Sequence, residues 1–227
     1  MMTIKKRIET IQHLIRQAEE SSHRPLHSVR LLAVSKQHSN DSITEAFNAG
    51  VRDFGENYLQ EALIKINALA HLPIDWHFIG SIQRNKTSAI AQHFNWVHTV
   101  SSRMIAERLN LARPDELPTL NVCIQLNVDD ETTKAGIHFD DALSLASHII
   151  TLPRLALRGL MVIPKPEKDF EKQVMSFLRI KQYLHEINTQ LGLSMDTLSM
   201  GMSHDFEAAI RAGSTIVRIG TAIFGER

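Results

Sequence analysis

Short apolar runs rich in β-branched residues alternate along the chain with longer segments whose apolar positions recur at helical spacing. The short runs predict eight strands, at residues 29–35, 51–54, 75–79, 96–100, 119–128, 156–163, 196–200 and 215–219. The longer segments predict helices at residues 39–49, 56–69, 84–93, 101–112, 140–151, 167–190 and 203–212. Strands that alternate with helices in this way indicate repeated βα units around a parallel sheet.

Eight βα units without a break in composition predict an α/β fold with a single (β/α)8 TIM barrel, in which residues 1–227 form one domain. An extra helix is expected before the first strand, because Ile4, Ile8, Ile11 and Ile15 recur at helical spacing. This helix is expected to cover the outside of the barrel where the last, truncated unit leaves a gap. An open, doubly wound sheet is the structural alternative, because periodicity alone does not distinguish an open sheet from a closed one.

Two of the predicted helices carry recognisable end signals. Gly50 follows the helix at 39–49 and suits the position just after a helix end. Ser203, the first residue of the range 203–212, is predicted to be the N-cap of that helix, with Asp205 in the first turn.

Composition excludes several classes of protein. The residues are 43% hydrophobic, which is enough for a substantial core, and 25 basic residues balance 25 acidic ones. No basic stripe with interleaved aromatic residues occurs, which argues against nucleic acid as a partner. Neither a signal peptide nor an apolar run long enough to span a membrane is visible, so we expect a soluble, cytoplasmic protein.

The cysteine and histidine content argues against a metal centre. The one cysteine, Cys123, lies in an apolar run and is expected to be a buried small hydrophobe. The chain has 12 histidines, but they form no HExxH motif and no cluster at ligand spacing, so no metal is expected. His77, in an alternating strand, is expected to be a core histidine that faces the barrel interior.

Candidate chemistry gathers at the predicted carboxyl ends of the first, seventh and eighth strands. Lys36 closes the first strand, and Ser199 and Gly201 end the seventh. The eighth ends with the set Arg218, Gly220 and Thr221. In a closed barrel the first and eighth strands are neighbours, and active groups lie at the carboxyl ends of the strands, so these residues are expected to meet.

An amine beside small-residue turns that suit a phosphate indicates a phosphate-bearing aldehyde cofactor, and pyridoxal 5'-phosphate (PLP) is the obvious candidate. Lys36 would form the Schiff base. Gly220 would let the backbone approach the phosphate, with main-chain N–H groups of Gly220 and Thr221 and the hydroxyls of Ser199 and Thr221 around it. Arg218 would face the ring nitrogen and disfavour its protonation, which makes the ring a weaker electron sink.

Five motifs in the same order resemble the pyridoxal phosphate homeostasis protein family. They are Ala-Val-Ser-Lys at 33–36, Phe-Gly-Glu-Asn-Tyr at 54–58, Trp-His-Phe-Ile-Gly at 76–80, Leu-Ser-Met-Gly-Met-Ser at 198–203 and Val-Arg-Ile-Gly-Thr-Ala-Ile-Phe-Gly at 217–225. The family's barrel is similar to the N-terminal domain of alanine racemase, a PLP enzyme of fold type III.

The resemblance implies roles for individual residues. Lys36 would carry PLP as a covalent aldimine, and Arg218 would face the ring nitrogen. Asn57 would line the ring side of the cofactor, with Met200 packed near the ring. The phosphate would lie against Ser199, Gly220 and Thr221.

Three functions remain open. The first is a PLP-binding protein of vitamin B6 homeostasis without catalytic turnover, which binds PLP as a monomer and passes it to PLP-dependent apo-enzymes. The second is a fold type III amino-acid racemase, which needs a second acid/base group across from the lysine. The third is a cofactor-free Schiff-base lyase or aldolase. We favour the first, because the sequence ends soon after the eighth strand and only Tyr58 and Tyr183 are available as catalytic tyrosines.

Overall fold

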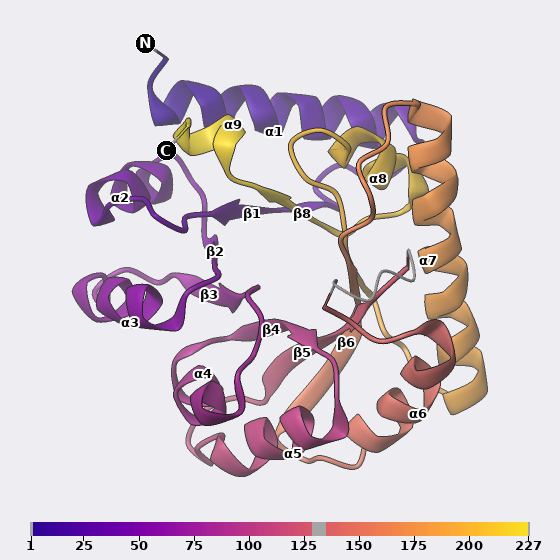
Figure 1. Ribbon diagram of the computed structural model, residues 1–227. Helices are drawn as coiled ribbons and strands as arrows, with labels where there is room; N and C mark the ends of the chain where they lie inside the picture. The colour runs from indigo at the N-terminus through magenta and orange to yellow at the C-terminus, as the bar shows by residue number, and fades with distance from the viewer. Residues whose placement is uncertain (1, 129–134, 227) are drawn as a thin grey trace.

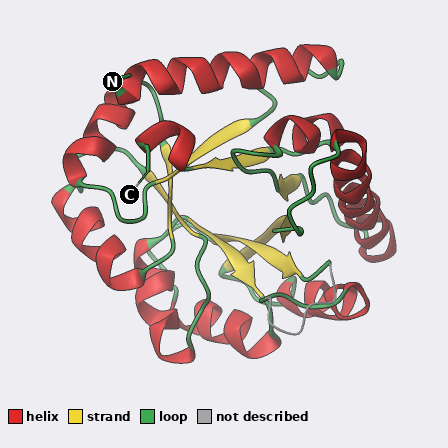
Figure 2. Ribbon diagram, turned by 45° about the horizontal axis from the view of Figure 1, so that its top comes forward, coloured by secondary structure: helices red, strands yellow, loops and turns green. Residues whose placement is uncertain are grey.

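The computed structural model describes residues 2–128 and 135–226, which form a closed barrel of eight parallel strands in the order β1 to β8. The barrel closes between β1 (Arg30–Val34) and β8 (Ile216–Ile219), where Leu32 pairs with Arg218 and Ala33 with Ile219. Figures 1 and 2 show the strands enclosed by a ring of helices. This closure confirms the predicted TIM barrel and excludes the open sheet.

The other strands follow the predicted positions closely. They are β2 (Asp53–Glu56), β3 (Asp75–Phe78), β4 (Trp96–Val100), β5 (Leu120–Leu126), β6 (Leu155–Val162) and β7 (Thr197–Ser199). The helices are α1 (Ile4–Ser21), α2 (Asn40–Asn48), α3 (Leu59–Ala68), α4 (Thr87–His93), α5 (Arg103–Ala112), α6 (Phe139–Ile149), α7 (Phe170–Leu191), α8 (Phe206–Ala212) and α9 (Thr221–Phe224). A short 3-10 helix, η1 (Arg84–Lys86), precedes α4.

Several helices begin later than the sequence predicts, among them α3 and α8. Glu56 belongs to β2, and α3 begins only at Leu59. The N-cap of α8 is Asp205, so the prediction of Ser203 as N-cap was wrong. The reason is a turn before the helix, in which Asp205 N donates to Met202 O at 3.1 Å and Met202 N donates to Asp205 Oδ1 at 2.6 Å.

The predicted extra helix, α1, closes the outside of the barrel. It contacts α2, α8 and α9 and buries Ile8, Ile11 and Ile15 (Figure 1). Its buried Glu19 accepts a hydrogen bond from Val29 N at 2.8 Å, immediately before β1. Among the described residues, no helix is both long enough and apolar enough to cross a membrane.

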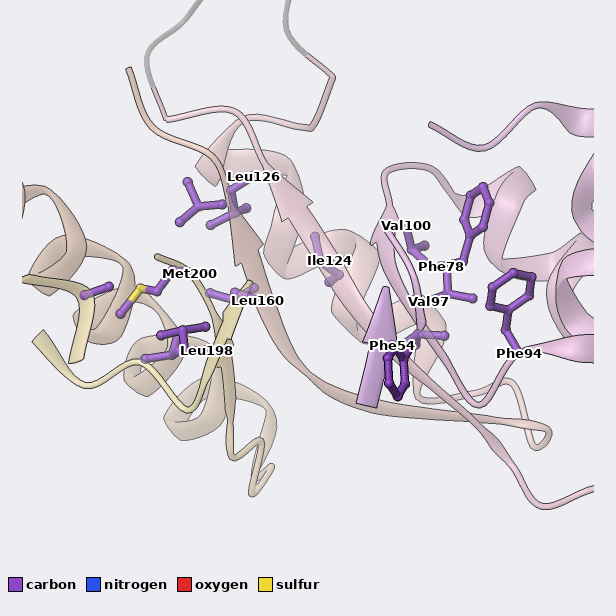
Figure 3. Close-up of a cluster of buried hydrophobic side chains, with 14 of the residues drawn as sticks. Phe54, Phe78, Phe94, Val97, Val100, Ile124, Leu126, Leu160, Leu198 and Met200 are labelled. Carbon is purple, nitrogen blue, oxygen red and sulfur yellow. The ribbon is translucent and has the colours of Figure 1, made fainter. Parts of the chain in front are cut away.

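Two apolar layers hold the barrel together. The larger layer lies between the strands and the helices, and Figure 3 shows part of it around Phe54, Phe78 and Phe94. The smaller layer fills the barrel interior and consists of Leu32, Ile79, Trp96, Cys123, Met161 and Ile216. Cys123 is fully buried, as expected, and burial raises the pKa of its thiol to about 12. The thiol is therefore inert at neutral pH.

Candidate functional site

A cavity of about 520 Å³ opens at the carboxyl ends of the strands, a volume typical of small-molecule sites. It is lined by residues at the carboxyl ends of β1, β6 and β8 and by residues in the loops that follow β1, β2, β3, β6, β7 and β8, as the barrel architecture predicts. The lining consists of Val34, Lys36, Asn57, Ile79, Met161, Ile163, Met202, Ser203, His204, Arg218, Gly220, Thr221 and Ala222. Five of the eight residues expected from the sequence are in this set.

Lys36 lies in the loop two residues beyond the end of β1 and is partly buried in the cavity wall. The loop is fixed on both sides of the lysine. Ser35 O accepts a hydrogen bond from Lys65 Nζ at 2.7 Å, and Gln37 N donates to Glu61 Oε1 at 2.5 Å. Gln37 adopts a positive φ of 63°, which is unusual for a residue other than glycine. These contacts hold the lysine at the cavity.

Behind the loop lies a buried ion pair that the sequence analysis missed. Lys65 Nζ lies 2.8 Å from Glu56 Oε1, and their side chains are only 5% and 0% exposed. Ser35 Oγ donates to the same carboxylate oxygen at 2.6 Å. Burial raises the pKa of Glu56, although the hydrogen bond and charge of Lys65 act in the opposite direction. The pair links β2, α3 and the Lys36 loop.

Arg218 points from β8 into the barrel and lines the cavity while being only 4% exposed. Its Nη1 donates to the main-chain oxygen and hydroxyl of Ser199 at 2.5 and 2.9 Å, and its Nη2 donates to Val162 O at 2.9 Å. Burial lowers the pKa of Arg218 to about 10, against the charge of Asp205, which raises it. Arg218 is therefore a fixed cation at neutral pH.

Asn57 presents an unsatisfied polar atom at the site. Its Oδ1 is buried and, among the described residues, has no hydrogen-bond partner. Buried polar atoms in native proteins are rarely unpaired, so an unpaired one in a cavity wall suits contact with a ligand. Gly80 permits this arrangement, because a Cβ there would lie 2.1 Å from Asn57 O.

Gly220 and Thr221 begin the short helix α9 on the cavity side. A side chain at position 220 would come within 3.3 Å of Val34 O, so glycine keeps β1 and the turn close together. Phe224, at the end of α9, stacks on His38 with ring centroids 4.7 Å apart. The turn after β8 is thereby attached to the loop that carries Lys36.

The other three expected residues lie outside the cavity lining. Ser199 is fully buried beneath Arg218 and supports it. Met200 is fully buried in the larger apolar layer (Figure 3). Gly201 has a φ of 97°, and a Cβ there would lie 2.7 Å from the Cβ of Ala209 in α8. These residues contribute by supporting the cavity wall from behind.

The sequence analysis did not assign Met202, Ser203 and His204 to the site, although all three line the cavity in the loop between β7 and α8. The barrel rule that places phosphate pockets after the seventh and eighth strands could have identified them. Asp205 holds this loop through its bond from Met202 N. Among the residues that the structure describes, no group of three metal-ligating side chains gathers.

Comparison with known proteins agrees with this geometry. The family model described as alanine racemase, N-terminal domain, matches residues 7–227. A pyridoxal phosphate homeostasis protein of Pseudomonas aeruginosa is 51% identical over 227 residues, which is all of this chain and 97% of the relative. Its counterpart in Escherichia coli K12 is 50% identical over 88% of this chain and 86% of the relative.

Solved structures give the same picture. PipY of Synechococcus elongatus, solved with PLP bound, superposes with a TM-score of 0.82 at 36% identity, covering 93% of this chain and 99% of PipY. Alanine racemase of Corynebacterium glutamicum has a TM-score of 0.69 at 16% identity over 96% of this chain and 61% of the racemase, a likeness of fold alone. The fold, the cavity at the strand ends and these relatives together show that the chain belongs to the pyridoxal phosphate homeostasis protein family, within the wider family of the alanine racemase N-terminal domain.

Proposed function

We propose that this protein binds PLP in the cavity at the carboxyl ends of its strands and takes part in vitamin B6 homeostasis without catalytic turnover. The observation that carries the proposal is that Lys36, Arg218, Gly220 and Thr221 line one cavity of suitable size. The set supplies an amine for an aldehyde, a cation for a heterocycle and a glycine turn for a phosphate. The naming of the relatives and the PLP bound to PipY support the same ligand.

Each residue has a defined task in this proposal. The Lys36 amine condenses with the aldehyde of PLP, forming a Schiff base and releasing one water. Arg218 faces the ring nitrogen and, as a fixed cation, disfavours its protonation. Gly220, Thr221 and the newly identified Ser203 hold the phosphate.

The remaining residues act around the ring and behind the cavity wall. Asn57 contacts the ring side through its unpaired Oδ1. Ser199, Met200 and Gly201 maintain the wall from behind.

Absence of turnover is the part of the proposal that separates it from a racemase. Racemisation needs an acid/base group opposite the lysine, which is a tyrosine in alanine racemase. Here Tyr58 is 51% exposed, and the Tyr183 hydroxyl donates to Phe139 O on the outer helices. Neither is in the described cavity lining, whereas His204 is. An assay for alanine racemisation, with a His204→Ala variant beside the wild type, tests this alternative.

The chemistry is tested by absorption spectroscopy of the protein incubated with PLP, followed by borohydride reduction and peptide mapping. We expect a visible Schiff-base band and a reduced adduct on Lys36. Lys36→Ala is expected to abolish the band, and Lys172→Ala, at an exposed lysine of α7, is expected to retain it. A protein that takes up no PLP contradicts the proposal and favours the cofactor-free Schiff-base enzyme.

One double variant tests the phosphate and ring contacts together, apart from the Schiff base. A variant with both Arg218→Leu and Thr221→Ala is expected to lose most of its affinity for PLP, because a buried cation and a hydroxyl are removed together. Tight binding of PLP by this double variant would contradict the residue assignments even if the aldimine on Lys36 were found.

The biological part of the proposal is that the protein, as a cytoplasmic monomer, passes PLP to PLP-dependent apo-enzymes. Mixing the loaded protein with such an apo-enzyme is expected to restore its activity faster than the same concentration of free PLP released across a dialysis membrane. Equal rates in both arrangements would mean that the protein only buffers PLP.

A further inference from the structure

A row of polar side chains runs through the barrel interior, from the amino-terminal end of the strands to the cavity at the other end. Asp53 Oδ1 lies 2.9 Å from His77 Nε2, and His77 Nδ1 lies 2.9 Å from His98 Nε2. His98 Nδ1 lies 2.8 Å from Ser199 Oγ, which lies 2.9 Å from Arg218 Nη1. The five residues come from five strands, β2, β3, β4, β7 and β8.

The row is buried and closely packed. His77 is 1% exposed, and His98 and Ser199 are fully buried. The His77 ring stacks on Trp96, with centroids 5.5 Å apart and planes inclined by 4°. Arg30 pairs with Asp53, and both Arg30 and Arg158 lie over the Trp96 ring. The two imidazoles therefore have a fixed orientation.

The charges at the two ends determine the direction of every hydrogen bond. Arg218 is a donor without an acceptor atom in its guanidinium group, so Ser199 Oγ accepts from it. At the far end the Asp53 carboxylate can only accept, so His77 carries its proton on Nε2. A neutral His77 then accepts at Nδ1 from His98 Nε2–H, and His98 Nδ1 accepts from the Ser199 hydroxyl.

The protonation states agree with this direction. Burial lowers the pKa of His98 well below its usual value, with further lowering from His77, Arg218 and Arg30. Burial also lowers the pKa of His77, against the raising effect of Asp53. Burial acts to raise the pKa of Asp53, but its contacts with His77 and Arg30 outweigh this and hold the pKa below its ordinary value. Both rings are thus neutral and Asp53 is ionised at neutral pH.

The reverse direction does not satisfy the same atoms. If His98 donated from Nδ1 to Ser199, then His77 would have to donate from Nδ1 to His98. A neutral His77 would then present its lone pair at Nε2 to the Asp53 carboxylate, so that two acceptors faced each other. Only one direction pairs each donor with an acceptor along the whole row.

We propose that Asp53, His77, His98 and Ser199 form a one-way hydrogen-bond chain that positions the guanidinium of Arg218 in the wall of the cavity. Ser199 is the link that contacts Arg218, and the two histidines keep the Ser199 hydroxyl proton turned away from the arginine. A fixed Arg218 would present its N–H groups to the PLP ring in one orientation. This consequence for PLP binding rests on the proposed function. The tautomers and hydrogen bonds of this hydrogen-bond chain in the ligand-free protein do not depend on that function.

The test compares Ser199→Ala with the wild type in both ligand-free and PLP-loaded forms. Ser214→Ala is the matched control, because Ser214 is also fully buried and its hydroxyl bonds to Met200 O at 2.7 Å without contacting the chain. Nitrogen-15 NMR of the ligand-free protein reports which ring nitrogen of His77 and His98 carries the proton and whether the Arg218 Nη protons give resolved signals. Absorption titration of the loaded form reports the affinity for PLP.

In the wild type we expect both histidines to be neutral with the proton on Nε2, and resolved Nη signals from Arg218. In Ser199→Ala we expect His98 to lose its single tautomer, the Arg218 Nη signals to broaden and the affinity for PLP to fall about fivefold. Ser199→Thr, which keeps the hydroxyl, is expected to restore the His98 tautomer. Ser214→Ala is expected to retain all three properties of the wild type.

The chain is disproved if the wild type shows a protonated or Nδ1–H histidine at position 77 or 98. It is also disproved if Ser199→Ala changes the ring and arginine signals no more than Ser214→Ala does. A wild type that shows the expected signals but binds no PLP would overturn the proposed function and leave the chain supported.

Discussion

Individual buried charges hold the site in place, and the pair of Lys65 with Glu56 is the clearest case. We expect Lys65→Met to lower the free energy of unfolding by about 3 kcal/mol, because it leaves the Glu56 carboxyl buried without its cation. Urea denaturation of the ligand-free protein measures this. The double variant Lys65→Met/Glu56→Gln is expected to lose less unfolding free energy than Lys65→Met alone. Lys172→Met, at an exposed lysine, is expected to lose almost none. A Lys65→Met variant as stable as the wild type would contradict this role of the ion pair.

Asp53 predicts a dependence of stability on pH. The pKa of Asp53 is lower in the folded protein than its ordinary value. Ionisation of Asp53 therefore stabilises the fold fully at pH values above the pKa that Asp53 has in the unfolded chain, and this contribution is lost as the pH falls through its pKa in the folded protein. We expect the difference in unfolding free energy between the wild type and Asp53→Asn to be full at neutral pH and to shrink below about pH 4. Urea denaturation over a pH series measures it.

The exposed pair of Asp115 with Arg154 provides the control for this experiment. The side chain of Asp115 is 80% exposed, so Asp115→Asn is expected to change the unfolding free energy little at any pH. A difference between the wild type and Asp53→Asn that is the same from acid to neutral pH would contradict the assignment.

At the scale of elements, the packing of α8 against β8 and against the turn that follows β7 depends on Gly201. We expect Gly201→Ala to cost about 3 kcal/mol of stability, because a Cβ adds a clash with Ala209 to the strain of a positive φ. Gly192→Ala is the matched control, since Gly192 also has a positive φ but no atom within 4 Å of the added Cβ. It is expected to cost about 1 kcal/mol. Equal losses in urea denaturation would show that Gly201 is needed only for its backbone conformation.

The elements also show what the sequence could and could not predict. Each strand is a short apolar run, so its position was visible in the hydrophobic pattern. The start of α8 was not, because both Ser203 and Asp205 are good caps and the turn from Met202 to Asp205 decides between them. The positions of Lys36 and Arg218 followed from the rule for strand ends. The Glu56–Lys65 pair depends on how α3 is oriented against β2, which no local pattern encodes.

For the whole molecule, closure of the barrel means that none of its strands is an edge. β1 pairs with both β2 and β8, so its amides are protected on both sides. We expect native-state hydrogen exchange to find the amides of β1 and β8 as slowly exchanging as those of β5 and β6, because all of them are released only by global unfolding. Much faster exchange in β1 and β8 would indicate that the barrel opens at the seam between them.

The seam has a consequence for synthesis on the ribosome. The cavity combines Lys36 with Arg218, Gly220 and Thr221, and the stack of His38 on Phe224 joins the same two segments. Translation proceeds from the amino terminus, so the lysine emerges long before the residues that complete its surroundings. A nascent chain that has not yet released residues 218–224 has no complete pocket. The complete pocket can therefore form only after residues 218–224 have left the ribosome and packed beside β1.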